Sequence, residues 1–119
     1  MPVLACASAR NIQCKHIDAE VNYWVDLGPM MLPGETVTGT PVATSEDPNL
    51  VIGAVTIVTP EQIIYSDEDC DVVLTTIGAD RGVYFMLSEG TVGMQTIKLV
   101  FDKSTGETDV INLLLRVVD

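Results

Sequence analysis

Four side chains of the kind that bind metals or act as nucleophiles are Cys6, Cys14, His16 and Cys70. Thiolate and imidazole suit zinc, but structural zinc sites usually separate paired cysteines by two to four residues. Cys14 and His16 are closer than that, and in an extended segment they share one side. No oxyanion-stabilising loop or orienting motif adjoins them, so cysteine–histidine catalysis is not expected. The odd number of cysteines indicates free thiols made in a reducing cytoplasm, rather than disulfides or a zinc site.

The densest acidic segment is 67–71, with Asp67, Glu68, Asp69 and Asp71. Carboxylates this close repel one another, and calcium relieves such repulsion and tolerates irregular loops. The spacing and the glycine of an EF-hand loop are absent. We expect a solvated turn between strands, with Asp67, Asp69 and Asp71 as weak calcium candidates. No metal or cofactor is therefore assigned.

Other chemistry-bearing motifs are missing from the sequence. It has no phosphate-binding glycine loop, no G-x-S-x-G nucleophile turn and no H-E-x-x-H zinc motif. Glycoside hydrolysis needs two carboxyl groups held at a defined separation across a cleft, and no pattern in the sequence indicates such a cleft. We predict that the protein is not an enzyme, and a small hydrolase ranks last among the readings.

The charge of the chain excludes several classes of partner. Its 119 residues include 17 acids and six Lys or Arg residues, which gives a formal net charge of −11. Nucleic acid and anionic lipid repel such a surface, so neither is an expected partner. Hydrophobic residues make up 47% of the chain and charged residues 19%, which favours a folded core over disorder. No apolar run is long enough for a membrane span or a signal peptide.

The sequence predicts that the elements which position any site are strands separated by turns. Apolar residues alternate with polar ones in several segments, and Gly, Pro and Asp clusters separate these segments. Pro41 marks an edge or a bulge, and Leu32-Pro33-Gly34-Glu35 has the chemistry of a tight turn. The predicted strands are 21–26, 36–44, 50–58, 70–77, 83–87, 96–102 and 109–118, and 62–65 is a short segment between two of them.

Short strands at 8–12-residue spacing are typical of a sandwich. We predict an all-β fold: an Ig-like antiparallel β-sandwich of about seven strands with an extended N-terminal arm. Residues 1–19 form the arm, or a first irregular strand, and residues 20–119 form a single β-sandwich domain.

Apolar residues outside the expected core are candidates for a protein interface. Met30, Met31 and Leu32 form an apolar loop tip, which either meets a partner or plugs the end of the sandwich. Leu114 and Val118 lie on the strand face opposite the main core row. These five residues are the predicted interface, although the sandwich or its arm could equally cover the last two.

Tyr23 and Trp24 are neighbours in one strand, so they point to opposite faces. We expect one in the core and the other exposed, or covered by the arm or a partner.

Several motifs recur along the chain in a familiar order. They are Asp18, NYW at 22–24, LPGETV at 32–37, VYFMLSEGTVG at 83–93, Ile97, STGET at 104–108 and LLLRV at 113–117. With these motifs the sequence resembles the fibre–tail adaptor proteins of tailed bacteriophages, small Ig-like virion proteins similar in build to phage capsid cement or decoration proteins. The resemblance extends over residues 15–118, although 40–80 match only in pattern.

This resemblance implies a non-enzymatic structural protein of the virion that joins a fibre or spike to the tail or head–tail connector. The alternative is a capsid cement protein that stabilises the phage head, and a second alternative is a calcium- or carbohydrate-binding module. The expected partners are other virion proteins, including copies of the chain itself in a symmetric homo-oligomer. The family supplies no catalytic residues. The protein would be made in the bacterial host cytoplasm and then assembled into the particle.

Overall fold

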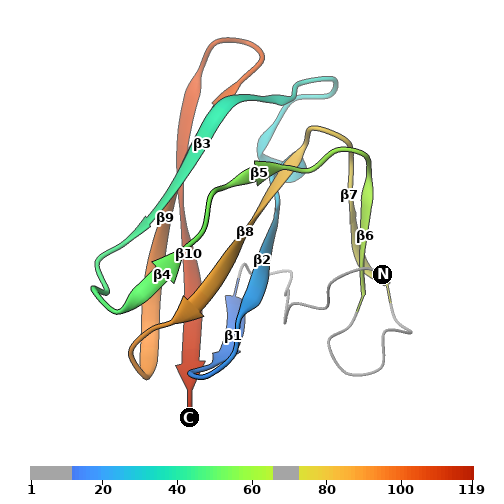
Figure 1. Ribbon diagram of the computed structural model, residues 1–119. Coiled ribbons are helices and arrows are strands. Elements are labelled where there is room, and N and C mark those ends of the chain that lie inside the picture. Colours follow the sequence, from blue (N-terminus) through green and yellow to red (C-terminus); the bar gives the residue numbers. More distant parts are fainter. Residues whose placement is uncertain (1–11, 66–72) are drawn as a thin grey trace.

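The computed structural model describes residues 12–65 and 73–119, and nearly all their regular structure is β-strand (Figure 1). Within these residues, eight strands form two sheets and two more form a separate hairpin. The large sheet has the order β1-β10-β9-β3, and the small sheet has β2-β8-β4, with β5 also paired to β8. The two sheets pack face to face, which confirms the predicted all-β sandwich.

The strands have the following bounds: β1 Ile12–His16, β2 Val21–Asp26, β3 Val37–Ser45, β4 Leu50–Ile52, β5 Thr56–Ile57, β6 Gln62–Tyr65, β7 Val73–Ile77, β8 Gly82–Glu89, β9 Gly93–Lys103 and β10 Thr108–Val118. One turn of 3-10 helix, η1 (Gly28–Met30), follows β2.

One strand lies inside the segment assigned to the arm. Strand β1 pairs with β10 in parallel, so the large sheet is not purely antiparallel as predicted. Its inward position holds Lys15, which is buried, and the ammonium donates to the carbonyls of His16 (2.9 Å) and Ile17 (3.1 Å). A buried lysine interrupts the apolar alternation by which a strand is recognised, and burial also lowers the pKa of Lys15.

The predicted strand 50–58 is divided in two. Strand β4 pairs with the end of β8, and β5 pairs with its beginning. Between them the chain leaves the ladder at Gly53, whose N–H still donates to the Met86 carbonyl at 2.8 Å. A Cβ at Gly53 would lie 3.4 Å from the Met86 Cβ, so the glycine permits this close approach.

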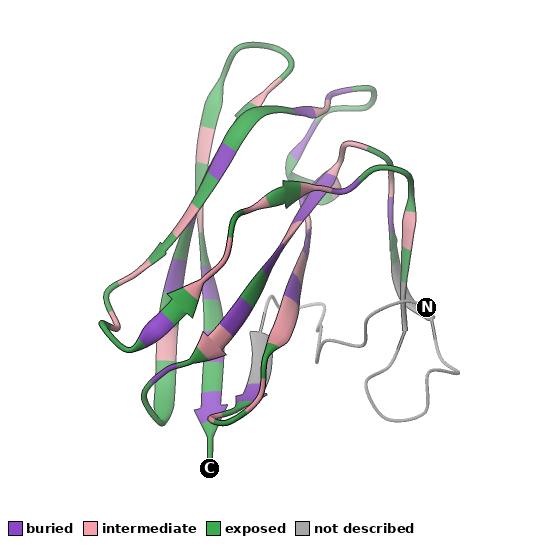
Figure 2. Cartoon of the chain, in the orientation of Figure 1, coloured by how far each residue is buried: buried purple, intermediate pink, exposed green. Residues whose placement is uncertain are grey.

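The main core lies between the two sheets, and buried and exposed residues alternate along most strands, as period-two side-chain directions require (Figure 2). The rings of Tyr23 and Phe85 stack in it with centroids 5.5 Å apart. The Tyr23 hydroxyl donates to the Leu114 carbonyl across the sandwich at 2.9 Å. The buried core residues are Tyr23, Val25, Leu27, Met31, Val37, Leu50, Val83, Phe85, Leu87, Ile97, Leu99, Phe101, Leu113, Leu115 and Val117.

A second, smaller cluster lies on the outer face of the small sheet. Trp24 stacks on Tyr84 with centroids 4.4 Å apart, and both pack against Val58 and Ile77. Tyr23 is therefore the core member of the aromatic pair, and Trp24 is covered by this chain's own β5–β7 region. Within the described part of the chain, the buried Trp24 Nε1 has no hydrogen-bond acceptor.

Candidate partner-binding loop

The loop between β2 and β3 forms one end of the sandwich, beside the β9–β10 hairpin (Figure 1). It begins at Leu27, which is buried in the core, and passes through η1. It then makes a tight turn in which the Glu35 N–H donates to the Leu32 carbonyl at 3.0 Å. Gly34 has φ +81°, a left-handed conformation that glycine adopts without strain. The predicted Pro-Gly turn is present.

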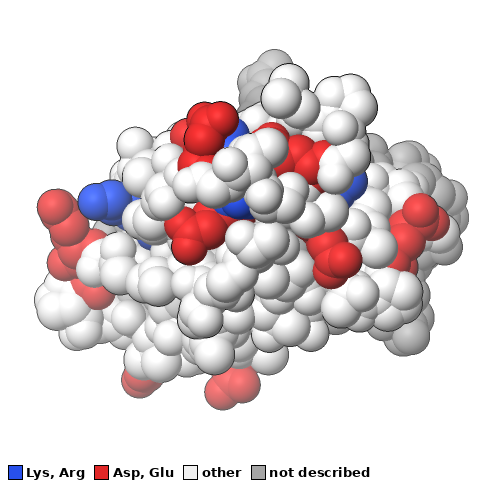
Figure 3. All heavy atoms as spheres, turned by 90° about the horizontal axis from the view of Figure 1, so that it is seen from above, with Lys and Arg blue, Asp and Glu red and all other residues white. Residues whose placement is uncertain are grey.

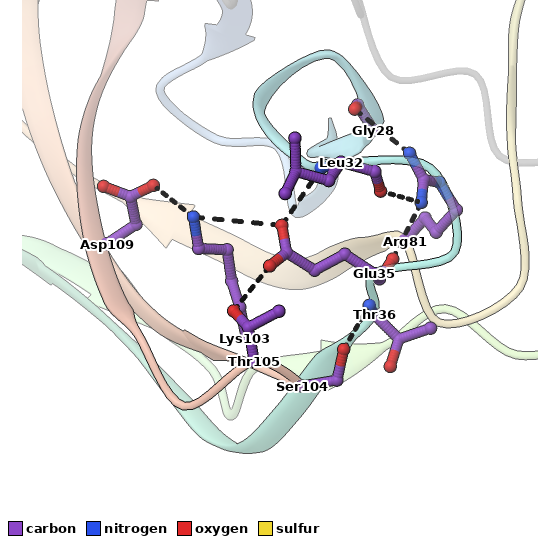
Figure 4. Close-up of polar contacts among 9 residues, drawn as sticks. All are labelled: Gly28, Leu32, Glu35, Thr36, Arg81, Lys103, Ser104, Thr105 and Asp109. Atoms are coloured by element: carbon purple, nitrogen blue, oxygen red, sulfur yellow. Dashed lines mark hydrogen bonds and ion pairs between the residues drawn. The ribbon is translucent and has the colours of Figure 1, made fainter.

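The carboxylate of Glu35 closes this turn from the inside (Figure 4). It accepts hydrogen bonds from the Leu32 N–H at 3.1 Å and from the Thr105 hydroxyl at 2.6 Å. The Lys103 ammonium lies 3.9 Å from Glu35 and 3.3 Å from Asp109. The Thr105 hydrogen bond, and after it that from Leu32, holds the pKa of Glu35 below its ordinary value. The hydrogen bond to Asp109 raises the pKa of Lys103.

Arg81 fixes the same loop from the opposite side (Figure 4). Its guanidinium donates to three loop carbonyls: Glu35 at 2.7 Å, Gly28 at 3.2 Å and Leu32 at 3.3 Å. A planar guanidinium presents several donors in a fixed fork, so one side chain can bind three carbonyls at once. The loop is therefore held in one conformation by Arg81, in the turn that precedes β8, as well as by its own turn.

The β9–β10 hairpin supplies the third contact. The Thr36 N–H donates to the Ser104 hydroxyl at 3.0 Å, and the Ser104 N–H donates to the Thr36 carbonyl at 2.8 Å. With the Thr105–Glu35 bond, these contacts join two turns that lie 68 residues or more apart in the chain. We call Glu35, Arg81, Lys103, Ser104 and Thr105 the loop network.

The network leaves two apolar side chains of the loop in solvent. Leu32 is 66% exposed and Met30 is 40% exposed. Met31 is different: it is 8% exposed and packs in the main core, so its predicted place in an accessible interface is wrong. The reason is that the chain leaves η1 in an extended conformation at Met31, which turns its side chain inward between two outward ones. Ordering this loop in advance reduces the entropy lost when a partner binds.

The loop lies at an acidic end of the molecule. Arg81 and Lys103 are both engaged by the loop carbonyls, Glu35 and Asp109, whereas Asp80 and Glu107 lie on the adjoining turns. Figure 3 looks down on this end and shows more acidic than basic side chains. An apolar tip within an acidic surround matches a partner with an apolar pocket and a basic rim.

The remaining predicted interface residues lie elsewhere. Leu114 and Val118 are 37% and 39% exposed on the outer face of the large sheet. Val118 is close to the C-terminus, at the end of the molecule opposite the loop (Figure 1). The structure thus brings Met30 and Leu32 together but separates them from Leu114 and Val118.

The candidate metal ligands do not converge in the described residues. Cys6, Cys70, Asp67, Asp69 and Asp71 lie outside them, as do the other residues of the acidic segment. Cys14 lies in β1, and the Nδ1 atom of His16 accepts a hydrogen bond from the Asp18 N–H at 3.1 Å. Within residues 12–65 and 73–119, no group of three or more His, Cys, Asp or Glu is placed to hold a metal ion.

Sequence reasoning predicted the loop but missed the network that holds it. The burial of Glu35 depends on Arg81, in the turn before β8, and on Lys103 and Thr105 at the β9–β10 hairpin, which no local pattern reveals. The one available signal was the recurrence of a Gly-Glu-Thr turn at 34–36 and again at 106–108.

No protein-family model matches the chain, and neither a curated protein nor a solved structure is significantly similar to it. In the described part of the chain, no helix has the length and apolar character needed to cross a bilayer.

Proposed function

We propose that the chain is a non-enzymatic structural protein of a tailed-bacteriophage particle, an adaptor that joins a fibre or spike to the tail or head–tail connector. The observation that carries the proposal is the apolar loop tip, Met30 and Leu32, held rigid by the loop network at an acidic end of the sandwich. The motif resemblance described above supports the choice of particle.

The loop geometry favours binding over catalysis. The Glu35 carboxylate is buried and already bonded to Leu32, Thr105 and Lys103, so it is not available to a substrate. Arg81 is likewise directed at backbone carbonyls rather than at an open cleft. What remains accessible is apolar surface on a fixed scaffold, which is the usual form of a protein-binding anchor.

The experiment is cryo-electron microscopy of purified phage particles whose genome encodes this chain, with the wild-type protein and the Leu32→Asp variant compared. An adaptor predicts density for a 12.8 kDa chain between tail and fibre. It also predicts fibreless particles from Leu32→Asp, because a charge replaces the anchor. The matched control is Val51→Asp, which changes an exposed apolar residue of β4 on the small sheet and should leave fibres attached.

Two outcomes contradict the adaptor. Density spread over the capsid lattice would mean that the chain is a cement protein. Absence of the chain from purified particles would exclude both virion functions.

A further inference from the structure

A row of valines crosses the outer face of the large sheet. Val100 of β9 pairs with Val42 of β3 on one side and with Val110 of β10 on the other. Paired residues point to the same side of a sheet, and the neighbours Leu99 and Phe101 are core residues, so the three valines point outward. Val42 and Val110 are 51% and 49% exposed. We call these three residues the valine row.

Opposite charges flank the valine row on the same face. Lys98 lies two residues before Val100 on β9, and Asp102 lies two residues after it. The Thr108 hydroxyl donates to the Asp102 carboxylate at 2.6 Å, which fixes its position. Lys98 is exposed, and it forms no ion pair with any residue that the structure describes, although the chain has 17 acids. Along β9, this face therefore presents a positive charge, then an apolar row, then a negative charge.

We propose that this face binds the same face of a second copy of the chain, through a two-fold axis that runs along the valine row. Rotation about such an axis reverses the strand direction and keeps each strand's place across the sheet. Each valine then meets its own counterpart. Lys98 of each copy meets Asp102 of the other copy, twice in the dimer. Self-complementarity of this kind is what an isologous interface requires.

The shape of this face is compatible with the proposed dimer. A shallow hollow of about 590 Å³ lies beyond Lys98, lined by the end of β3 and the turn after it, by β9 and by Asn112. The same rotation carries the other copy's β9–β10 hairpin tip, residues 104–107, over this hollow.

The size of the face sets the strength of the contact. Three strands about 4.8 Å apart, overlapping along roughly 27 Å, give a face of about 400 Å² for each copy. Stable dimers bury about 800 Å² for each partner. We therefore expect weak association of the free protein, with a dissociation constant in the high micromolar to millimolar range, which a symmetric assembly would strengthen by raising local concentration.

The test is sedimentation velocity of the purified chain at rising concentration, up to about 1 mM, in about 0.15 M salt. Wild-type protein should shift from monomer towards dimer. Lys98→Asp and Asp102→Lys should each raise the dissociation constant about tenfold or more, because two attractive contacts become repulsive ones. An equimolar mixture of the two variants should associate again, since every facing pair is then of opposite charge.

The matched control is Arg116→Asp. Arg116 is the other exposed cation among the described residues and lies on the same face, six residues along β10 from Val110 and outside the facing Lys98–Asp102 pairs, so its charge reversal should raise the dissociation constant much less than Lys98→Asp does. Asp102→Lys also removes the acceptor of the Thr108 hydroxyl, so a variant that keeps Asp102 is needed. Val110→Asp is such a variant, and it should abolish association because it places a charge within the valine row. Circular dichroism of each variant verifies that the monomer remains folded.

A chain that stays monomeric at every concentration overturns the proposal. So does a dimer that Lys98→Asp does not weaken, or a mixture of the two variants that fails to associate. This surface lies on the large sheet rather than on the loop, so these results leave the adaptor proposal untouched.

Discussion

Replacement of Arg81 by methionine tests whether the loop network stabilises the fold. The substitution keeps an unbranched side chain of similar bulk near the loop but removes the donors to the Gly28, Leu32 and Glu35 carbonyls. A hydrogen bond from a charged donor contributes about 1.5–3 kcal/mol when it is shielded from water. Arg81 is only partly buried, and two of its three bonds are longer than 3.0 Å, so we expect about 0.5–1 kcal/mol for each.

The sum is a loss of about 2 kcal/mol in the free energy of unfolding, which corresponds to a Tm lower by about 6–10 °C for a domain of this size. The assay is urea unfolding followed by the fluorescence of Trp24, the only tryptophan of the chain, which stacks on Tyr84 in the folded state. Arg116→Met is the matched control, since it makes the same change at an exposed position and should alter stability by less than about 0.5 kcal/mol.

Equal stabilities for the two variants would refute the reasoning, because they would mean that water replaces the guanidinium at no cost. Hydrogen exchange gives a second readout. The loop amides should exchange faster in Arg81→Met but not in Arg116→Met.

Three further predictions concern single side chains. The lowered pKa of Glu35 means that its contribution to stability is present above the ordinary glutamate pKa of 4.5 and is lost as the pH falls through the folded-state pKa, so Glu35→Gln should show a shallower loss of Tm in acid. Burial raises the pKa of Tyr23 above 10, so the unfolded state releases this proton first and stability falls at higher pH. Tyr23→Phe should remove that alkaline loss and cost about 1 kcal/mol at pH 7 by urea unfolding, because the carbonyl bond is lost. Met31→Asp should destabilise the chain by more than about 3 kcal/mol, whereas Leu32→Asp should lie within about 0.5 kcal/mol of wild type in the same assay.

The strands were predictable where one face is apolar and the other polar. In β9, for example, the buried residues Ile97, Leu99 and Phe101 alternate with Thr96, Lys98, Val100 and Asp102, of which only Val100 is apolar, so the pattern itself indicates the core. Alternation does not reveal a strand whose inward residue is polar, as at Lys15 in β1. Lys15 can be buried there because backbone carbonyls accept hydrogen bonds from its ammonium group.

The same distinction explains the site. The turn at 32–35 was predictable, since Pro and Gly set its backbone angles locally. The place of Met31 in the core was not, because one residue's rotation along an irregular loop decides which of three consecutive apolar side chains faces inward. Nor was the contact of Glu35 with Thr105, which depends on the register of β3 against β9 within the large sheet rather than on either segment alone.

The distribution of basic residues connects the two proposed surfaces. Lys15, Arg81 and Lys103 donate to groups within the fold, so they give the exterior little positive character. The exposed cations of the described residues, Lys98 and Arg116, are both on the outer face of the large sheet. We therefore expect a basic partner to bind at the loop end rather than on this face, and we expect a second acidic copy to bind here, where it meets an exposed lysine. One chain can in this way hold two different neighbours without competition between them.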